Sequence, residues 1–450
     1  MSTAAAPPRP QRRGRPWRGP LDVETFAETA AADCADAATA LAQQRDSAGV
    51  VTTRPEWAWD AVATANHLRV DGRRRIGFGP LSAFFATADG WVRTHANYPH
   101  HVAALRSALS LPDDAGPDDV ARALGALPSL EAEERVTAAG GLAVAVRTAA
   151  GGLAVAVRTA AELAAAEPVA VRGTPGHRPD HALAPGAAHR LPPLADGDLP
   201  LRGLRVMALT RVLAGPSAAR LLASLGADVL RIDPPALPEL PDQHLDTGFG
   251  LRTAEADLAT REVLDRVHTL LQRADVLLTG YRPGALARFD LEGPGVRARH
   301  PGLTVVALSA WGTIGPWAGR RGFDSLVQAA SGIADVYRGA DGRPGALPVQ
   351  ALDYVTGFRV ATSAMRLLAA RARDGAGSAH LALLDSATEL LALPGPGGTP
   401  DDAGPELAET DSPSGRLLHV PPPFAVGGER LAHRWAPRPY GDDELAWAGG

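Results

Sequence analysis

Short apolar runs alternate with amphipathic stretches through the second half of the chain. The runs have the length and the residue types of buried strands, and they occupy Leu204–Leu209, Asp228–Ile232, Asp275–Thr279 and Leu303–Leu308. Between them, residues 217–225 and 261–273 place apolar residues at helical spacing. Strands that alternate with helices in this way build a parallel sheet with helices on its faces. The pattern therefore predicts an α/β fold.

A further helix is predicted over Tyr354–Arg371, because helix breakers are few and the apolar residues form one face. Asp353 precedes this helix and would be its N-cap, accepting a hydrogen bond from the first turn. The same position stabilises an ionised carboxylate through the helix dipole, and an ionised carboxylate is a nucleophile. The local residues leave both roles open.

The N-terminal half predicts a smaller α+β domain over residues 21–172. Residues 21–45 and 117–165 are rich in Ala, Leu, Val and Glu at helical spacing. The segment Arg74–Tyr98 mixes aromatic and β-branched residues around an Asp89-Gly90 turn signal, as a strand hairpin does.

An eleven-residue sequence, TAAGGLAVAVR, occurs at Thr137–Arg147 and again without change at Thr148–Arg158. A repeat this short and this perfect is typical of a recent local expansion, not of a solenoid. We assign it no function.

Segments rich in Pro, Gly and polar residues separate the predicted units. Composition predicts a disordered basic tail (1–20), an interdomain linker (173–200), an α/β core (201–393), a flexible loop (394–415) and a C-terminal tail that wraps the core (416–450).

Composition narrows the classes of partner. The chain has 450 residues, which is enough for two or three domains, and its 45 basic and 50 acidic residues give a net charge of −5. This balance gives no electrostatic reason to bind nucleic acid or an anionic membrane. There is also no apolar run of about twenty residues, as a membrane span needs.

The single cysteine, Cys34, cannot form a disulfide within the chain, and no Cys/His cluster predicts a metal site. The first twenty residues carry basic residues without the apolar stretch of a signal peptide. We therefore expect a cytoplasmic protein with no metal.

The turn Arg211–Pro216 joins the first predicted strand to the first predicted helix of the core. Gly215 in such a turn lets a ligand approach the backbone, and the following helix N-terminus favours an anion. The three-glycine GxGxxG pattern is absent, so a nicotinamide site is disfavoured while another phosphate-bearing ligand stays open. Arg252, Arg282 and Arg288 lie near predicted strand ends, where they would contact phosphates or be ordinary surface charges.

Six segments in this order resemble the family III CoA-transferases of the CaiB/BaiF type. This family includes formyl-CoA and carnitine CoA-transferases and the α-methylacyl-CoA racemases. The segments are RVLAGP (211–216), LGADVLRID (225–233), ADVLLTGYRPGAL (274–286), HPGLTVVALSAWGTIGP (300–316), GFDSLVQAASGI (322–333) and ALDYVTG (351–357). The resemblance covers about residues 201–392 and implies a Rossmann-like parallel-sheet domain.

The resemblance implies that Asp353 is the catalytic nucleophile of an acyl-CoA:carboxylate CoA-transferase. Its carboxylate would form a mixed anhydride with the donor acyl group and then an aspartyl-CoA thioester. The substrates implied are acyl-CoA and a small carboxylic acid, with no permanently bound cofactor, and the assembly implied is an interlocked homodimer. The residues implied to hold CoA are Arg211, Val212, Leu213, Ala214, Gly215, Arg252, Tyr281, Arg282 and Arg288.

Phe323 separates the two reactions of the family. Racemase-like members carry His at the matching position, and this His moves a proton on and off the α-carbon together with the aspartate. Phe cannot titrate, so CoA transfer is favoured. The neighbouring Asp324 is interpreted as a cap for a helix over Ser325–Ala330, with a role as a base as the alternative.

The chain departs from the family in three ways. Material that resembles the small domain precedes the core instead of following it, Leu251 stands where a Lys or Arg is usual, and the glycine-rich loop that covers the aspartate intermediates is not recognisable. Three alternatives to the transferase therefore stay open: a racemase, a noncatalytic CoA-binding homologue and a nicotinamide enzyme. Trp311, Trp317 and Phe323 are interpreted as pocket or as core aromatics.

Overall fold

The computed structural model describes residues 14–74, 77–148, 191–397 and 404–448. Most of the second repeat copy, the first part of the linker 173–200 and the N-terminal residues 1–13 lie outside these described ranges.

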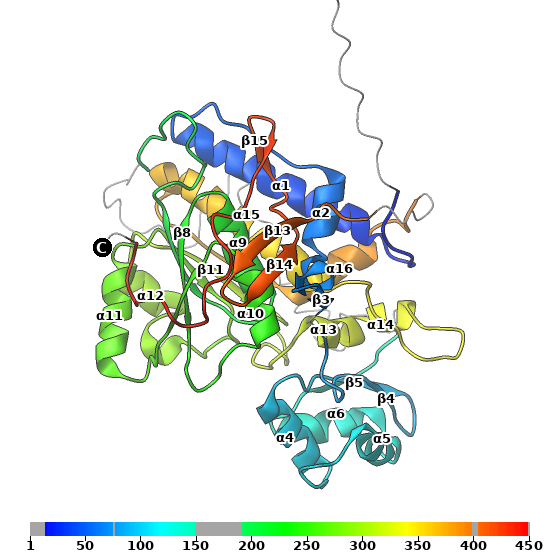
Figure 1. Ribbon diagram of the computed structural model, residues 1–450. Coiled ribbons are helices and arrows are strands. Elements are labelled where there is room, and N and C mark those ends of the chain that lie inside the picture. The colour runs from blue at the N-terminus through cyan, green and yellow to red at the C-terminus, as the bar shows by residue number, and fades with distance from the viewer. Residues whose placement is uncertain (1–13, 75–76, 149–190, 398–403, 449–450) are drawn as a thin grey trace, which may run out of the picture.

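A six-stranded sheet forms the centre of the molecule (Figure 1), and every neighbouring pair of its strands is parallel. Its order is β12-β11-β10-β7-β8-β9. The strands are β7 (Arg205–Leu209), β8 (Asp228–Asp233), β9 (Arg252–Glu255), β10 (Val276–Thr279), β11 (Thr304–Ser309) and β12 (Ser378–Ala382). The predicted α/β fold with a parallel sheet is confirmed.

The two faces of the sheet bury different side chains, because successive residues of a strand point to opposite sides. In β7, Val206 and Ala208 join the core beneath α9 (Ala214–Ser224) and α15 (Ala351–Asp374). Met207 and Leu209 join the other core, which the amphipathic helix α11 (Arg261–Leu271) and the shorter α12 (Gly293–Arg299) cover.

The first turn of α15 differs from the sequence prediction. The helix begins at Ala351, and its first intrahelical bond runs from the Tyr354 N–H to the Gln350 carbonyl (3.1 Å). Asp353 is therefore the third helical residue and not the N-cap. The position still favours negative charge, since the dipole acts throughout the first turn.

A small unit lies below the sheet domain in Figure 1. Its antiparallel sheet has the order β4-β5-β6. A separate core joins this sheet to three short helices. The elements of the unit are β4 (Phe84–Ala86), β5 (Trp91–Thr94), α4 (Pro99–Ala108), α5 (Pro117–Gly125), α6 (Ser129–Ala138) and β6 (Ala143–Ala145).

The structure divides the predicted domain 21–172, because its first helix belongs to the sheet domain. This helix, α1 (Val23–Gln44), lies along α15 and buries Ala27, Ala31 and Ala38 in the main core. Small side chains let the two helices approach closely, so an alanine face marks a helix-packing surface. The short elements that follow α1 are β1 (Val51–Thr52), α2 (Pro55–Ala61), α3 (Thr64–His67), β2 (Arg69–Val70) and β3 (Arg73–Arg74).

The C-terminal segment pairs with the N-terminal one. Strand β14 (Gly415–His419) lies between β13 (Ala408–Ser412) and β2, and β15 (Ala425–Val426) lies between β1 and β16 (Glu429–Arg430). The predicted loop 394–415 is therefore interrupted by β13. Residues 431–448 then follow the edge of the central sheet, where the Trp435 indole donates to the Leu251 carbonyl (3.1 Å).

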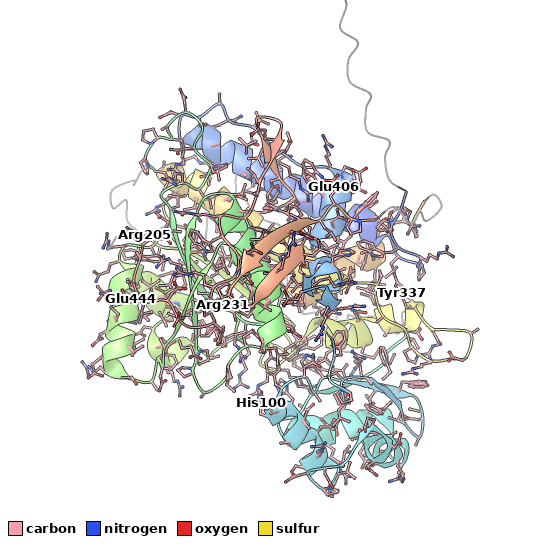
Figure 2. The ribbon with its side chains drawn as sticks, viewed as in Figure 1. His100, Arg205, Arg231, Tyr337, Glu406 and Glu444 are labelled. Carbon is pink, nitrogen blue, oxygen red and sulfur yellow. The ribbon has the colours of Figure 1, made fainter. Side chains whose placement is uncertain are left out.

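Figure 2 shows how densely side chains fill both parts of the molecule, with Arg231 inside the sheet domain and His100 where the small unit faces it. Among the described helices, none is both long and apolar enough to cross a membrane.

Candidate active site

Two buried carboxylates meet where the first turns of two helices come together. Asp324 opens α13 (Asp324–Ser331), is fully buried, and accepts the backbone N–H of Asp353 on Oδ2 (3.1 Å). Its other oxygen accepts the side-chain amide of Gln328, whose own carbonyl accepts the Leu347 N–H (2.9 Å). Asp324 is thus fixed on both oxygens and in turn fixes the start of α15.

Burial changes the acidity of this pair. Burial raises the pKa of Asp353 well above its ordinary value, and the charge of Asp324 raises it further. The pKa of Asp324 is raised to about 6 by burial, against the hydrogen bonds from Gln328 and the Asp353 backbone and the nearby charge of Arg93. The pair therefore holds protons more strongly than exposed carboxylates do, and both groups titrate together.

Topology places Asp353 at the carboxyl edge of the sheet. Helix α15 leads directly into the parallel strand β12, so its first turn lies at the edge where the strands end. Helix α9 starts at the same edge, because it follows β7. This edge is the usual ligand side of an open α/β sheet.

Gly357 brings α15 into backbone contact with the first turn of α9. A Cβ added to Gly357 would lie 2.8 Å from the Ala214 carbonyl oxygen and 3.1 Å from the Ser217 Cβ. Asp353 is one helical turn before Gly357 and on the same face of α15. The nucleophile candidate and the predicted 211–216 turn are therefore neighbours.

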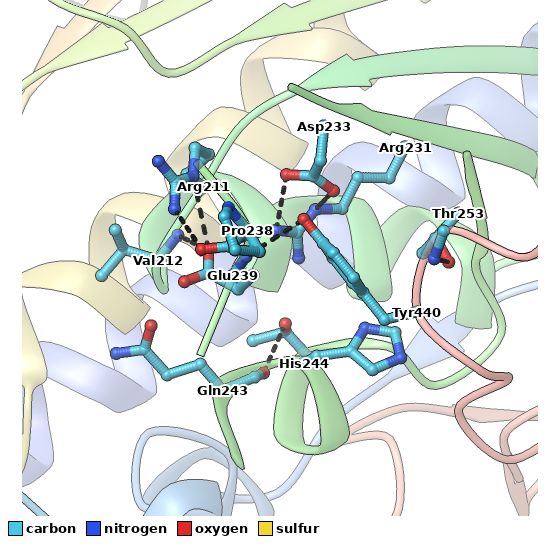
Figure 3. Close-up of polar contacts among 12 residues, drawn as sticks. Arg211, Val212, Arg231, Asp233, Pro238, Glu239, Gln243, His244, Thr253 and Tyr440 are labelled. Atoms are coloured by element: carbon cyan, nitrogen blue, oxygen red, sulfur yellow. Dashed lines mark hydrogen bonds and ion pairs between the residues drawn. The ribbon is translucent and has the colours of Figure 1, made fainter. Parts of the chain in front are cut away.

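A buried charge network holds this turn (Figure 3). Val212 has a φ of +70°, which a β-branched residue rarely adopts, and its N–H donates to Oε2 of Glu239 (2.7 Å). The same carboxylate forms ion pairs with Arg231 (3.1 Å) and Arg211 (4.0 Å) and accepts the Tyr98 hydroxyl. Burial raises the pKa of Glu239, but these partners outweigh burial and lower it. Glu239 is therefore a fixed anion that locks the strained turn.

Two more predicted CoA residues, Tyr281 and Arg282, follow β10 and so lie at the same edge. Tyr281 is partly buried, and burial followed by the charge of Asp233 raises its pKa. Arg282 is exposed. Arg288 is exposed on the short helix η1 (Ala287–Phe289), with its guanidinium 4.5 Å from the centre of the Phe289 ring.

Arg252 is not brought to this group. It begins β9, and its guanidinium binds Asp228 Oδ1 (2.7 Å) and the Ala446 carbonyl. Asp228 is the first residue of β8, so this ion pair lies at the amino edge, opposite Asp353. Leu251 beside it is fully buried in the main core. Leu251 and Arg252 lie at the start of β9, which is the edge of the sheet away from the ligand side. In this structure they therefore stabilise the fold.

A cleft of about 250 Å³ opens between the small unit and the sheet domain. Residues 140–144 of the small unit form one side, and Trp311, Trp317, Arg282 and Arg321 line the other. The two tryptophans are buried and meet edge to face, so they are core aromatics that also form a wall of the cleft. Burial and the charge of Arg282 lower the pKa of Arg321, which indicates two cations close enough to attract one anion.

The small unit supplies residues that the sequence did not reveal. The His95 ring stacks on Phe323, with centroids 3.7 Å apart and planes 10° apart, and the charge of Arg93 acts on Asp324. Gly140, in the first copy of the repeat, lines the cleft, and Arg321 donates to its carbonyl at 3.5 Å. No local pattern marks these residues, since the contacts join segments far apart in the sequence.

Within the described ranges, no group of three potential ligands could hold a metal ion.

Comparison with known proteins gives a consistent set of similarities. Residues 201–395 match the profile described as CoA-transferase family III. Succinate–glutarate CoA-transferase of Agrobacterium fabrum is 32% identical, over 43% of this chain and 53% of its own. Probable fatty acyl-CoA transferase Rv3272 of Mycobacterium tuberculosis is 30% identical, over 44% of this chain and 54% of its own. The chain thus spans about half the length of these curated relatives.

Two solved structures are similar to part of this chain. The crystal structure of Rv3272 from Mycobacterium tuberculosis is 32% identical and covers 43% of this chain and 58% of its own, with a TM-score of 0.41. A CAIB/BAIF family protein from Brucella suis is 30% identical and covers 43% of this chain and 56% of its own, with a TM-score of 0.40.

Proposed function

We propose that the chain transfers CoA from an acyl-CoA thioester to a carboxylic acid, with Asp353 as the nucleophile. The match of residues 201–395 to CoA-transferase family III supports this proposal. The observation that carries this proposal is the setting of Asp353: a buried carboxylate at the ligand edge, one helical turn from the α9 contact. Burial and the charge of Asp324 are the two influences on its pKa, and both raise its basicity.

The reaction proceeds through two anhydrides and one thioester. A carboxylate oxygen of Asp353 attacks the donor carbonyl, the C–S bond breaks, and the CoA thiolate leaves a mixed anhydride. The thiolate then attacks the aspartyl carbonyl and releases the donor carboxylate, so that Asp353 carries CoA as a thioester. The acceptor carboxylate attacks this thioester, and the thiolate released attacks the acceptor acyl carbon of the second anhydride, which frees Asp353.

We assign CoA to the ligand edge and the cleft beside it. The turn 211–216 offers a close backbone approach, and Arg282, Arg288 and Arg321 supply positive charge for the phosphates. Arg252 is left out of this site because Asp228 neutralises it at the opposite edge. A homodimer and a cytoplasmic location are parts of the same proposal, and the mass in solution measured by light scattering tests the dimer.

Proton exchange at the α-carbon is the second candidate. The stack of His95 on Phe323 favours this reaction, because it places an imidazole beside the position where racemase-like members carry their His. Burial, His101 and Arg93 hold the pKa of His95 well below 6.5, so the ring is neutral at physiological pH and unlike a proton-donating imidazolium. Exchange of deuterium into the α-carbon of a 2-methylacyl-CoA, in the absence of any acceptor, would show that the protein catalyses proton exchange and not CoA transfer.

The test of the transferase is intact mass after incubation with acetyl-, butyryl- and succinyl-CoA, followed by brief hydroxylamine treatment and peptide mapping. The expected result for the wild type is a CoA-sized or acyl adduct in the intact mass and, after hydroxylamine has displaced CoA or the acyl group, a hydroxamate at Asp353 in the peptide map. Asp353→Asn should show neither. Binding of CoA without an adduct from any donor would instead indicate a noncatalytic CoA-binding protein. A thermal shift with NAD and none with CoA would indicate a nicotinamide site.

A further inference from the structure

The Nδ1 atom of the His95 ring is buried, and no other described residue forms a hydrogen bond with it. The His95 side chain is 4% exposed. Buried polar atoms almost always have a partner, because leaving one unpaired costs its lost hydration. An orphaned atom of this kind is free to bond to a water molecule or to a bound ligand.

The neighbouring Asn97 determines which nitrogen of His95 carries the proton. Asn97 Oδ1 accepts the Gly79 N–H (2.9 Å) and the Ser82 hydroxyl (2.6 Å), so these donors fix the orientation of its amide. The amide nitrogen of Asn97 then points to His95 Nε2 at 3.3 Å. An amide nitrogen only donates, so Nε2 must accept.

The proton of the neutral ring consequently lies on Nδ1. Burial, followed by the charges of His101 and Arg93, keeps the pKa of His95 well below its ordinary value, so the neutral form is the one present near pH 7. Apart from a contact of the ring with the backbone of His95 itself, Nδ1–H is thus an unpaired donor among the described residues, and it does not change charge during a reaction.

The His95 ring contacts the residue that precedes Asp324 in the chain. The His95 ring rests on Phe323 with a centroid distance of 3.7 Å, and Phe323 immediately precedes Asp324, which binds the Asp353 backbone. Two hydroxyl groups of this neighbourhood are also without partners among the described residues: Ser325 Oγ, beside Asp324, and Ser217 Oγ, on the α9 turn that meets Gly357. Three unpaired polar atoms therefore lie on residues that belong to, or contact, the starts of α13 and α15.

We propose that Nδ1–H of His95 donates a hydrogen bond to the carbonyl oxygen of the acyl group that reacts at Asp353. Attack on the carbonyl turns this oxygen into an oxyanion, and a fixed donor in a dry site stabilises the oxyanion more than the carbonyl. The proton stays on Nδ1 throughout, so no bond to hydrogen breaks. The inference rests on the proposed transferase activity and assigns to the small unit a direct part in it.

The test compares three variants of the full-length protein. His95→Phe keeps a ring on Phe323 but removes the donor, His95→Asn places an amide N–H near the position of Nδ1, and His95→Gln places its amide near Nε2 instead. The rate of adduct formation at Asp353 with a saturating acyl-CoA is measured by quenched-flow mass spectrometry. The Kd for free CoA, which lacks an acyl oxygen, is measured alongside it.

We expect His95→Phe to slow adduct formation by about 100-fold, as loss of one oxyanion donor does. His95→Asn should recover at least a tenfold part of this loss, and His95→Gln should stay close to the Phe variant. The Kd for CoA should remain unchanged in all three. The thermal midpoint of His95→Phe should not fall, because the substitution removes an unpaired buried donor and the partly exposed Asn97 amide can bind water.

Three results would overturn the proposal: adduct formation in His95→Phe as fast as in the wild type, no recovery in His95→Asn, or a joint loss of CoA affinity and thermal stability, which indicates a purely structural role. If the wild type forms an adduct and the variants match it, the inference about His95 fails and the transferase assignment stands. If the wild type binds no CoA and forms no adduct, the transferase assignment fails and the inference fails with it.

Discussion

The backbone N–H of Asp353 donates a 3.1 Å hydrogen bond to the carboxylate of Asp324. This bond joins the first turn of α15 to the first turn of α13, and it places a fixed anion beside the candidate nucleophile. The nucleophile is therefore held at its backbone by the same group that makes its side chain more basic.

The first prediction concerns stability and pH. Because burial raises the pKa of Asp353 in the folded state, the folded protein binds more protons than the unfolded chain above the ordinary carboxyl pKa, near 4. The unfolding free energy must then fall by about 1.4 kcal/mol for every pH unit between about 4 and the folded pKa. Asp353→Asn should be more stable than the wild type at pH 7 and equal to it at pH 4, as measured by urea denaturation. The exposed Asp196→Asn is the control, and parallel pH curves for wild type and Asp353→Asn would show that burial leaves the pKa of Asp353 unchanged.

The second prediction concerns reactivity and pH. Removing the charge of Asp324 lowers the pKa of Asp353, so more of the nucleophile is ionised at acidic pH. In Asp324→Asn the rising limb of adduct formation against pH should move down by about one pH unit. Asp324→Ala also removes the acceptor of the Asp353 N–H, so its rate should fall at every pH. An unshifted limb in Asp324→Asn would show that the two carboxylates are not coupled.

The third prediction concerns the crossing of α15 and α9. Gly357→Ala forces a Cβ within 2.8 Å of the Ala214 carbonyl oxygen, which is backbone and cannot swing away. We expect a loss of about 1–3 kcal/mol in unfolding free energy, together with slower adduct formation. The matched control is Gly125→Ala in α5, where the nearest atom is the Ala86 carbonyl at 4.0 Å. Better helix propensity should leave that variant as stable as the wild type or up to about 1 kcal/mol more stable.

The fourth prediction separates two arginines that have the same predicted role in the sequence. Arg282→Gln should weaken CoA binding about tenfold, or about 1.4 kcal/mol, without a change in thermal midpoint. Arg252→Gln should leave the Kd for CoA unchanged and lower the midpoint, because Asp228 and the Ala446 carbonyl lose their partner. Calorimetric titration with CoA and a thermal scan measure both. An equal loss of CoA affinity in the two variants would show that Arg252 also contributes to CoA binding.

The fifth prediction concerns the buried anion that holds the Val212 turn. Glu239→Gln removes the charge facing Arg231 and leaves Asp233 as its other carboxylate partner (2.7 Å). We expect a loss of about 3 kcal/mol in unfolding free energy, measured by urea denaturation, because Arg231 keeps only one of its two carboxylate partners and Arg211 loses its own. The exposed Glu262→Gln should change stability by less than about 0.5 kcal/mol.

Hydrophobic patterning predicts those parts of the fold whose strands are buried on both faces. Strands β7, β8, β10 and β11 are apolar runs, and their positions follow from the sequence within about two residues. Strand β9 (RTAE) and the edge strand β12 (SAHLA) have no such run, so only their pairing reveals them. Helix α1, which the sequence groups with the small domain, packs in the main core along α15, because an alanine face does not say which helix it packs against.

The candidate site is partly predictable for the same reason. Asp353 and the 211–216 turn lie in local patterns of a strand, a turn and a helix start, and such patterns can be read along the chain. The edge on which Arg252 lies depends on the direction of β9, which a sequence pattern does not give. The His95–Phe323 stack depends on how the small unit meets the sheet domain, and no periodicity records that contact.

The pairing of β1 with β15 and of β2 with β14 affects how the protein is made. A ribosome adds about 5–20 residues per second, so Val70 leaves it tens of seconds before its partner Leu417. Through that interval β1 and β2 lack their partner strands β15 and β14. Until α15 is synthesised, the alanine face of α1 also stays exposed to solvent. The small unit, which has its own core, can fold meanwhile. In the nascent chain, the N-terminal segment is therefore still unfolded when the small unit has folded. This segment can aggregate until the strands from β13 onward are synthesised.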